Sequence, residues 1–389
     1  MKNVHLIMVT ENNNNKFYDM SQISADSFEV KYGRIDSTCT TKVYPMSKWN
    51  SLYNSKIKKG YKDKSELVKE VVASNDYTAI SNKSVAKLIA DLQAYAKKTV
   101  QENYEIVNVT QQMIDEAEML IDELSKRTTV STFNSALMEI FTTIPRRMKK
   151  VKDYLATSNK DFAKIVSRER DLLDTLTTQV ATQNKKATAN NQTLLEAFGL
   201  EIEEHDDELE AKVKDMLGEI SDKYINCWYV TNEKTQKRYN DNMKSKRGIH
   251  KTEELFWHGS RNENWMSILT NGMMIRPSNA IYTGSMFGSG IYFANKARKS
   301  YGYTSSAHAY WVNGNAKKVY MAIFSVNICK YHNVYSHTSE CYDFSKAYLK
   351  NKGNFDSTFA HAGNSLRNDE IIVYDEAQVT IHAIVELKG

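Results

Sequence analysis

The chain has few cysteines and no long apolar run. Its four cysteines, Cys39, Cys227, Cys329 and Cys341, are scattered, and the last two have a spacing that fits no metal-binding motif. Neither a disulfide framework nor a zinc site is therefore indicated, and we expect four buried free thiols. No stretch approaches the run of about 18 apolar residues that a membrane-spanning helix needs.

The N-terminus also lacks the features of a secretory signal. The stretch "MKNVHLIMVTENNNNKFY" contains only a short apolar patch, and no small-residue cleavage site follows it. We therefore expect the protein to act inside the cell, and in the nucleus if its source is eukaryotic. No internal repeat is visible at periods of about 20 to 50 residues.

What the chain does contain is typical of ordinary globular domains. It has 389 residues, of which 41% are hydrophobic and 25% charged, so two or three domains are expected. Residues 191–225 carry 11 acidic and 3 basic side chains, whereas residues 1–80 carry 12 basic and 9 acidic ones, densest at "KIKKGYKDK". The acidic run indicates a solvated face. The basic cluster fits either another solvated face or a nucleic-acid site.

The pattern of apolar residues changes along the chain. In the first part, Phe28, Val30 and Tyr32 alternate with polar residues before Gly33, which predicts a half-buried strand ending in a turn. From Ser81 onward the apolar residues recur at helical spacing, for example at Val85, Leu88, Ile89 and Leu92, or at Phe133, Leu137, Ile140 and Ile144 before Pro145. This predicts at least four amphipathic helices, which end near residue 183 and precede a polar linker over 181–192.

The C-terminal part is predicted to be mostly sheet. An acidic helix is expected around Glu208 to Ile220, followed by strands at 318–328, 370–375 and 378–388. In the last strand, Val379, Ile381, Ala383, Val385 and Leu387 should share one buried face. The sequence thus predicts an α+β multidomain protein with a small β-rich domain at 1–80, an α-helical bundle at 81–190 and a mainly antiparallel β domain at 191–389.

A glycine cluster in this last domain stands beside residues that could carry chemistry. Gly284, Gly288 and Gly290 allow a ligand to approach the backbone closely, but the pattern is not a phosphate loop, because no Gly-Lys-Ser/Thr follows. His258 and Tyr292 flank the cluster, and Tyr303 lies eleven residues beyond the second of them. Glu370 opens an apolar strand, where a carboxylate is costly to bury unless it has a charged partner or a catalytic role. Purely structural roles stay open: a structural histidine at His258, sheet packing for the two tyrosines, and a structural salt bridge at Glu370.

These residues resemble a known family. The segments "WHGSR", "TGSMFGSGIYFA", "KSYGY" and "NDEIIVYDEAQV" resemble the NAD-binding core of the poly(ADP-ribose) polymerases, and the family's His-Tyr-Glu triad falls on His258, Tyr292 and Glu370. Upstream, "AKLIADLQAYAKK" and "FTTIP" resemble the regulatory helical domain of the DNA-dependent members. The segments "FEVKYGRID" and "KIKKGY" resemble their WGR domain, with Tyr32 in place of the tryptophan.

The resemblance implies a role for each residue of an NAD+ site. The Gly259 backbone and the Ser300 hydroxyl would hold the nicotinamide carboxamide, while Tyr303 stacks on the ring and Tyr292 closes its other side. His258 would bind the ribose hydroxyls. Further residues implied to contact the dinucleotide or the growing chain are Ser260 and Asn264 along the adenosine half, and Lys299.

The resemblance also implies a reaction. A carboxylate at Glu370 would stabilise the positive charge that develops on the ribose as nicotinamide leaves, and it would orient an acceptor hydroxyl for chain elongation. NAD+ is then a substrate, and no metal is expected. Protein acceptors, including the chain itself, are implied, and no membrane partner is expected.

The resemblance finally implies regulation by DNA. DNA ends with a 5′-phosphate would meet Tyr32, Arg34, Lys58 and Lys59, and binding would open the NAD+ site that the helices otherwise cover. Two other functions stay open. One is a mono-ADP-ribosyltransferase or NAD glycohydrolase that acts on protein or nucleic-acid termini. The other is an inactive nucleic-acid-binding scaffold.

Overall fold

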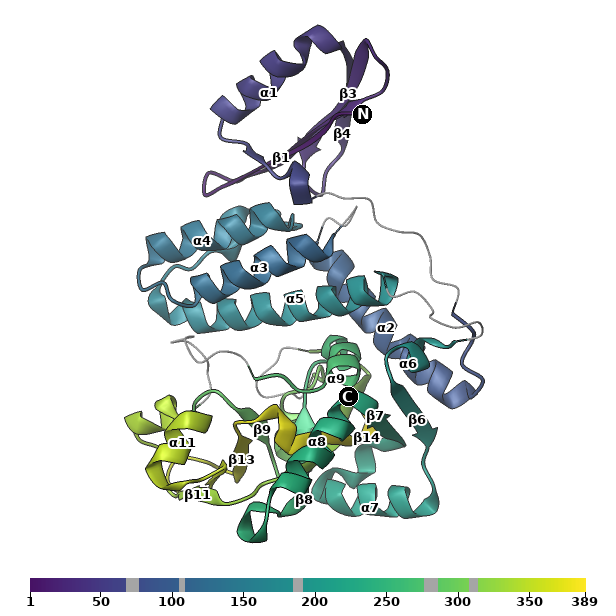
Figure 1. Ribbon diagram of the computed structural model, residues 1–389, viewed down its shortest axis with the longest axis vertical. Helices are drawn as coiled ribbons and strands as arrows, with labels where there is room; N and C mark the ends of the chain where they lie inside the picture. Colours follow the sequence, from purple (N-terminus) through teal and green to yellow (C-terminus); the bar gives the residue numbers. More distant parts are fainter. Residues whose placement is uncertain (68–76, 105–108, 185–191, 276–285, 308–313) are drawn as a thin grey trace. The chain divides into compact units, whose positions relative to one another are not determined.

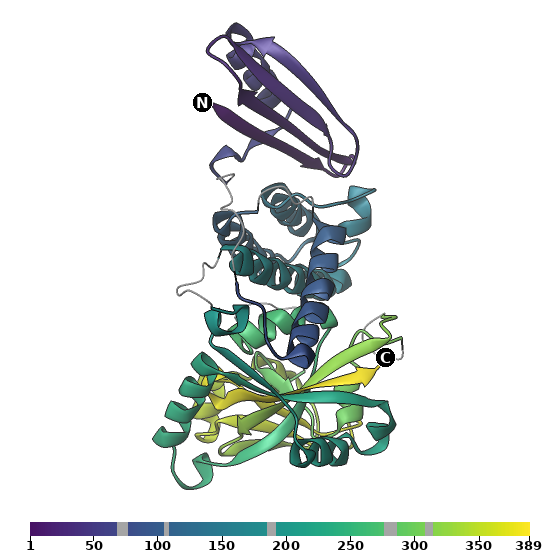
Figure 2. The same ribbon diagram turned by 90° about the vertical axis from the view of Figure 1, so that its right-hand side faces the viewer.

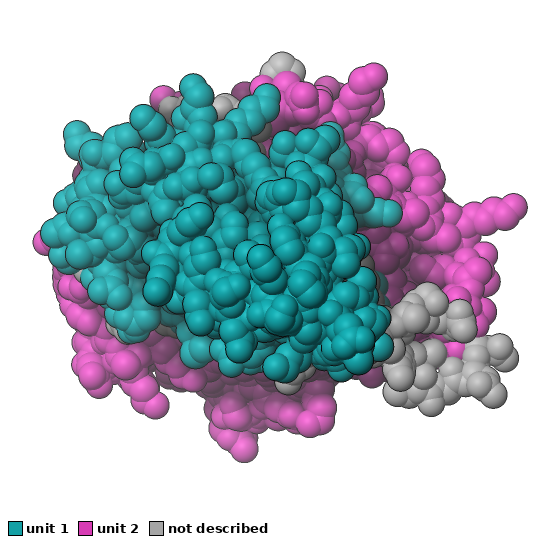
Figure 3. Space-filling model, turned by 90° about the horizontal axis from the view of Figure 1, so that it is seen from above, with its two compact units in different colours: residues 1–74, 97–184, 279–282 teal, residues 75–96, 185–278, 283–389 magenta. Residues whose placement is uncertain are grey.

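The computed structural model describes residues 1–67, 77–104, 109–184, 192–275, 286–307 and 314–389, which form two compact units. The first unit contains the described residues within 1–74 and 97–184. The second contains those within 75–96, 185–278 and 283–389 (Figure 3). No helix in the described ranges combines the length and the apolar character needed to cross a membrane.

The first unit begins with an antiparallel sheet, in which β1, β3 and β4 are labelled in Figure 1. The sheet has five strands in the order β4-β3-β2-β1-β5. Phe28 and Val30 are fully buried in its core and Tyr32 packs against it, so the strand predicted there is confirmed. The strand continues through Gly33 to Arg34, however, so the turn lies after the predicted position. The strands and the helix that follows them are β1 (Asn3–Thr10), β2 (Asn14–Gln22), β3 (Ser27–Arg34), β4 (Cys39–Pro45), α1 (Trp49–Lys58) and β5 (Lys62–Asp63).

The cysteine prediction is wrong at one position. Cys227, Cys329 and Cys341 are buried free thiols, but Cys39 is exposed. Cys39 begins β4, an edge strand of the sheet whose residues are mostly exposed, so no second layer covers its side chain.

Four helices follow the sheet, as the periodicity predicted. They are α2 (Lys83–Asn103), α3 (Gln111–Leu124), α4 (Val130–Thr143) and α5 (Phe162–Asn184). Threonine side chains cap α3 and α4 by accepting hydrogen bonds from main-chain N–H groups in the first turn. The core contains Phe133 stacked on Phe162, with ring centroids 3.9 Å apart. In contrast, Val85, Leu88, Ile89 and Leu92 in the first half of α2 pack in the core of the second unit.

Hydrogen bonds join the sheet of the first unit to its helical part. Asn13 forms the β1–β2 turn with a φ of 62°, a backbone conformation that asparagine tolerates better than most residues. Its side-chain oxygen accepts hydrogen bonds from Arg34 (3.1 Å) and from the Val151 N–H (3.0 Å). Arg34 also donates to the carbonyls of Met148 (3.0 Å) and Lys149 (2.8 Å). One asparagine and one arginine therefore connect three separate chain segments.

The second unit contains two sheets (Figure 2). The five-stranded sheet is antiparallel, in the order β6-β7-β14-β10-β8, and the four-stranded sheet has the order β11-β12-β13-β9, in which only β11 and β12 are parallel. The strands are β6 (Leu200–Glu204), β7 (Tyr224–Asn232), β8 (Glu253–Gly259), β9 (Ile291–Phe293), β10 (Lys318–Asn327), β11 (Tyr331–Val334), β12 (Ser357–Ala360), β13 (Glu370–Val373) and β14 (Val379–Lys388). The α+β class with mainly antiparallel sheets is thus as predicted.

The helices of this unit lie around the sheets. The predicted acidic helix is α7, which an Asp206 side chain caps, and a 3-10 helix over Gly218–Lys223 follows it. The helices are α6 (Leu194–Ala197), α7 (Asp207–Leu217), α8 (Glu233–Ser245), α9 (Trp265–Asn271), α10 (Ala297–Tyr301) and α11 (Lys346–Gly353).

The alternation predicted along β14 is wrong in its second half. Val379 and Ile381 pack in one core, whereas Ala383 and Val385 pack in another on the opposite face. The register with β10 shifts at this point, because Ile323 pairs with Ala383 while Phe324 pairs with Ile381, which leaves His382 as an extra residue. A β-bulge of this kind reverses the face to which the following side chains point.

Candidate active site

The predicted NAD+ residues of the second unit gather where its two sheets meet. Trp257 in β8 and Ala294, which follows β9, exchange two main-chain hydrogen bonds of 2.9 Å and form an isolated antiparallel bridge. We call this bridge the seam. His258 and Gly259 follow Trp257 on one side of the seam, and Tyr292 precedes Ala294 on the other.

His258 makes a second link across the seam. Its Nδ1 lies 3.0 Å from the Tyr292 carbonyl oxygen. A carbonyl only accepts, so Nδ1 carries the proton and Nε2 of the neutral ring is left with a lone pair. Burial lowers the pKa of His258, against the hydrogen bond to Tyr292, which raises it. The ring is therefore neutral near pH 7 and offers an acceptor at Nε2.

Aromatic residues hold the His258 ring in place. The rings of Trp265, Phe293 and Phe324 surround it edge-on, with centroids between 5.9 and 6.4 Å away. A ring packed in this way keeps one orientation, which fixes the direction of the Nε2 lone pair.

Gly259 and Ser300 lie in direct backbone contact. A Cβ added at Gly259 would be 1.8 Å from the Ser300 carbonyl oxygen, so no larger residue fits there without a shift of the backbone. The Ser300 hydroxyl is buried and donates to the Trp257 carbonyl at 3.2 Å. The two residues that the resemblance assigns to the carboxamide are therefore side by side, and both lie next to the seam.

Tyr292 anchors the loop before it. Its hydroxyl donates to the Gly288 carbonyl (2.8 Å) and accepts from the Phe287 N–H (3.0 Å). Gly288 has a φ of 71° and lies so close to the Phe344 backbone that an added Cβ would be 2.0 Å from its carbonyl oxygen. Gly288 and Gly290 thus serve close packing, while Gly284 lies outside the described residues.

Glu370 begins β13 and forms an ion pair with Lys299 of α10. The side chains of Lys299 and Glu370 are only 13% and 11% exposed. Burial lowers the pKa of Lys299, and the Glu370 carboxylate opposes this effect. Burial and then the Glu370 charge raise the pKa of Tyr303 to about 12, which places Tyr303 in the same electrostatic environment. The salt bridge that the sequence left open does exist, and its partner is another predicted site residue.

Ser260 and Asn264 form a local pair just after β8. The Asn264 amide donates to the Ser260 hydroxyl at 3.1 Å, and both side chains are partly buried. Ser260 directly follows Gly259, so this polar pair lies at the end of β8, beside the predicted site residues His258 and Gly259 in the chain.

The predicted DNA-binding residues belong to the first unit. Lys58 and Lys59 are exposed at the C-terminal end of α1. Tyr32 is partly buried, and its ring lies 5.6 Å from that of Tyr18. The Arg34 guanidinium already donates hydrogen bonds to the carbonyls of Met148 and Lys149, so it is less available to a DNA phosphate than the two exposed lysines are.

Sequence reasoning missed Asp369, the neighbour of Glu370. Its carboxylate accepts hydrogen bonds from the Asn295 amide (2.9 Å) and from the Ala362 N–H (2.7 Å). These bonds tie the segment before Glu370 to the residues after β9 and β12. The acidic pair in "NDEII" was visible, but the partners are far away in sequence. No group of three or more metal-ligating side chains lies together in the described ranges.

Known proteins resemble the part of the chain that contains this site. Residues 201–389 match the family model described as the poly(ADP-ribose) polymerase catalytic domain. The chain is 36% identical over 192 residues to "Uncharacterized protein 101L" of Invertebrate iridescent virus 6, covering 48% of this chain and 80% of that protein. It is 31% identical over 140 residues to "Putative poly [ADP-ribose] polymerase-like 100L" of the same virus, covering 36% of this chain and 73% of that protein. It is also 33% identical over 150 residues to the poly [ADP-ribose] polymerase of Drosophila melanogaster, covering 35% of this chain and only 15% of that protein.

Proposed function

Because the chain belongs to the poly(ADP-ribose) polymerase family and contains its catalytic domain, it is an NAD+ ADP-ribosyltransferase, and we propose that it builds poly(ADP-ribose) on proteins, itself included, when it binds a DNA end. Residues 201–389 carry the transferase chemistry in this proposal. The finer parts concern the length of the product, the acceptors and the role of DNA.

The observation that carries the polymer proposal is the position of Glu370. It is buried, and it opens a strand that is paired with β9, on which Tyr292 lies. As the bond between the ribose C1′ and the nicotinamide nitrogen breaks, the electron pair leaves with nicotinamide and positive charge develops on the ribose. A carboxylate at this point stabilises that charge, and it then accepts the proton of the acceptor hydroxyl as its oxygen bonds to C1′. For chain growth the acceptor is a ribose hydroxyl of the preceding unit.

His258 supports the same reaction by orientation. Its Nε2 lone pair accepts a hydrogen bond from a ribose hydroxyl, while its Nδ1–H is held by the Tyr292 carbonyl. The Gly259 backbone and the Ser300 hydroxyl hold the carboxamide, and Tyr303 and Tyr292 enclose the nicotinamide ring. Ser260 and Asn264 contact the adenosine half, and Lys299 positions Glu370.

For DNA ends we assign direct phosphate contacts to Lys58 and Lys59, which are exposed, and stacking to Tyr32. Arg34 acts differently, because its donors are used by the carbonyls of Met148 and Lys149. DNA bound at the sheet would therefore act on the helical part of the first unit through Arg34. We expect the enzyme to work in the compartment where DNA is repaired.

The test is incubation with labelled NAD+, with and without a short duplex that carries a 5′-phosphate. Wild type is compared with Glu370→Gln and with Glu340→Gln, a matched control that removes one charge from an exposed Glu-Lys pair of the same unit. We expect a DNA-dependent ladder of modified protein in wild type and Glu340→Gln, and a single unit or nothing in Glu370→Gln.

Other outcomes would change the proposal in separate ways. A single added unit in wild type would make the protein a mono-transferase, and free ADP-ribose without modified protein would make it a glycohydrolase. A ladder that is equally strong without DNA would remove the regulation and keep the polymerase.

A further inference from the structure

The strongest concentration of positive charge in the second unit lies along α8 and the segment after it. Residues 234–251 contain seven lysines or arginines and a single carboxylate, Asp241. The segment lies in the unit that carries the catalytic domain, apart from the predicted DNA-binding residues of the first unit. Nothing in the NAD+ site uses it.

A groove of about 530 Å³ follows this helix. Two groups of residues line it: Ala377 of the 3-10 helix Glu376–Gln378, and from α8 the residues Lys234, Lys237, Arg238, Asp241, Asn242 and Ser245. Arg238 donates from Nη1 to Glu376 at 2.8 Å. Its Nε and Nη2 atoms are buried, and neither has a hydrogen-bond partner in the part of the chain that the structure describes. Buried donors without partners are costly, so the positive charge of Arg238 beside the groove is only partly compensated, by Glu376.

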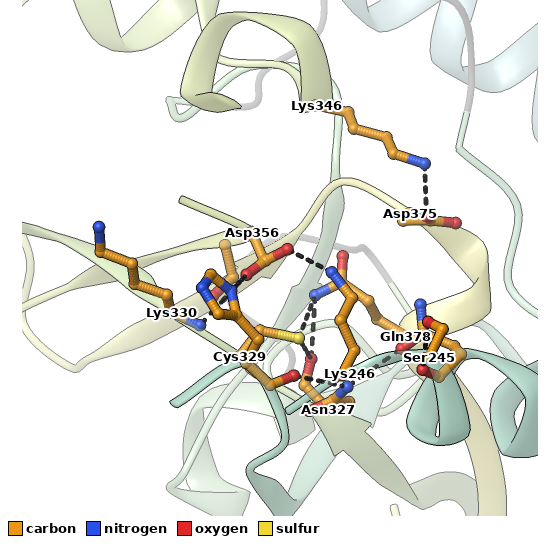
Figure 4. Close-up of polar contacts among 12 residues, drawn as sticks. Ser245, Lys246, Asn327, Cys329, Lys330, Lys346, Asp356, Asp375 and Gln378 are labelled. Carbon is orange, nitrogen blue, oxygen red and sulfur yellow. Dashed lines mark hydrogen bonds and ion pairs between the residues drawn. The ribbon is translucent and has the colours of Figure 1, made fainter. Parts of the chain in front are cut away.

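Several cations near the groove are already neutralised. Lys246 contacts Asp356 at 2.6 Å, and Lys346 contacts Asp375 at 2.5 Å (Figure 4). Lys237 has only a loose, exposed contact with Asp241 at 3.7 Å. The remaining cations are exposed and form no ion pair with any described residue: Lys234, Lys244, Arg247 and Lys251. Four uncompensated positive charges within one short segment attract a polyanion rather than a single carboxylate.

We propose that the α8 groove and these four cations bind the phosphate backbone of a DNA duplex. This inference rests on the proposed function for the choice of DNA, and it adds a second contact surface on the catalytic unit. The groove lining contains no aromatic ring, and Tyr239, the aromatic residue of α8, is only 3% exposed. Single strands and ADP-ribose polymers expose bases that proteins bind by stacking, whereas a duplex presents mainly phosphates. A surface with charge and no exposed ring therefore fits a duplex.

The experiment measures equilibrium binding of the full chain to a fluorescent duplex over a series of salt concentrations. The variant Lys234→Gln/Lys244→Gln/Lys251→Gln leaves Arg238 and its ion pair intact. The control Lys212→Gln/Lys317→Gln/Lys350→Gln removes the same charge from three exposed lysines elsewhere in the second unit. Each lost phosphate contact lowers the slope of log affinity against log salt by about 0.9. We expect a slope smaller by about 2 to 3 for the α8 variant and a much smaller change for the control.

An α8 variant with the slope of the control would overturn the proposal, provided that both have the melting temperature of wild type. Loss of affinity for poly(ADP-ribose) or single-stranded DNA, with duplex binding unchanged, would also overturn it and assign the groove to that polymer. NAD+ turnover without DNA is measured in parallel and should not change in either variant. If DNA binds through α8 but does not stimulate wild-type turnover, the activation proposal fails and the α8 site stands.

Discussion

The ion pair between Lys299 and Glu370 allows chemistry and stability to be separated. Glu370→Gln removes the charge that opposes the burial of Lys299, so we expect the pKa of Lys299 to fall further and the folded state to lose stability. Removing one partner of a buried pair typically costs about 3 to 5 kcal/mol. Because each side chain keeps about an eighth of its exposure, we expect the lower end, about 3 kcal/mol. For a unit of this size that corresponds to a melting temperature lower by about 6 to 12 °C.

The double variant Lys299→Met/Glu370→Gln should recover most of this stability, because no buried charge is then left without a partner. It should not recover turnover. If Glu370 stabilises the charge on the ribose, its loss should lower kcat by about 100- to 1000-fold in both variants, with little change in KM. Thermal unfolding followed by circular dichroism and a labelled-NAD+ assay measure the two effects.

Two results would refute this reasoning. If the double variant is as unstable as Glu370→Gln, the burial of an unpaired Lys299 is not the cause of the loss. If the double variant regains turnover, Glu370 acts only as the structural partner of Lys299, and the chemistry lies elsewhere.

Three further predictions concern single residues. The pKa of His258 is lower in the folded than in the unfolded state, so below about pH 6.5 the unfolded state binds more protons. The free energy of unfolding should therefore decrease as the pH is lowered, by up to about 1.4 kcal/mol per pH unit. Urea unfolding at several pH values should show a weaker pH dependence in His258→Gln. Gly259→Ala should lower both the melting temperature and NAD+ turnover, because the new Cβ collides with the Ser300 carbonyl. Arg34→Ala should destabilise the first unit by about 1.5 to 3 kcal/mol in urea unfolding through the loss of its bonds to main-chain carbonyls, whereas Lys58→Ala should change stability by less than about 0.5 kcal/mol.

The sequence predicted the helices and strands better than it predicted how they pack against one another. The helix over Val85 to Leu92 was visible from its period, but the period does not say which core receives that face, and the face packs in the second unit. The bulge at His382 was not predictable either. A bulge depends on how two strands align, and β10 and β14 are far apart in the chain.

The candidate site shows the same limit. Its residues could be named from the order of the motifs, because each motif is short and local. The pairing of Lys299 with Glu370 spans 71 residues, and that of His258 with Tyr292 spans 34, so neither follows from local spacing. The charge on α8 could have been found by counting lysines and arginines over 234–251, but the groove beside it required the fold.

The seam has a consequence for how the active site forms during folding. The Trp257–Ala294 bridge and the His258–Tyr292 hydrogen bond join strands of different sheets, so a chain with only one sheet formed has no site. Each sheet can regain β structure by itself, whereas NAD+ turnover requires both sheets to be formed and joined at the seam. Recovery of NAD+ turnover during refolding should therefore lag behind the return of β structure, which makes catalysis itself a reporter of the moment at which the two sheets dock.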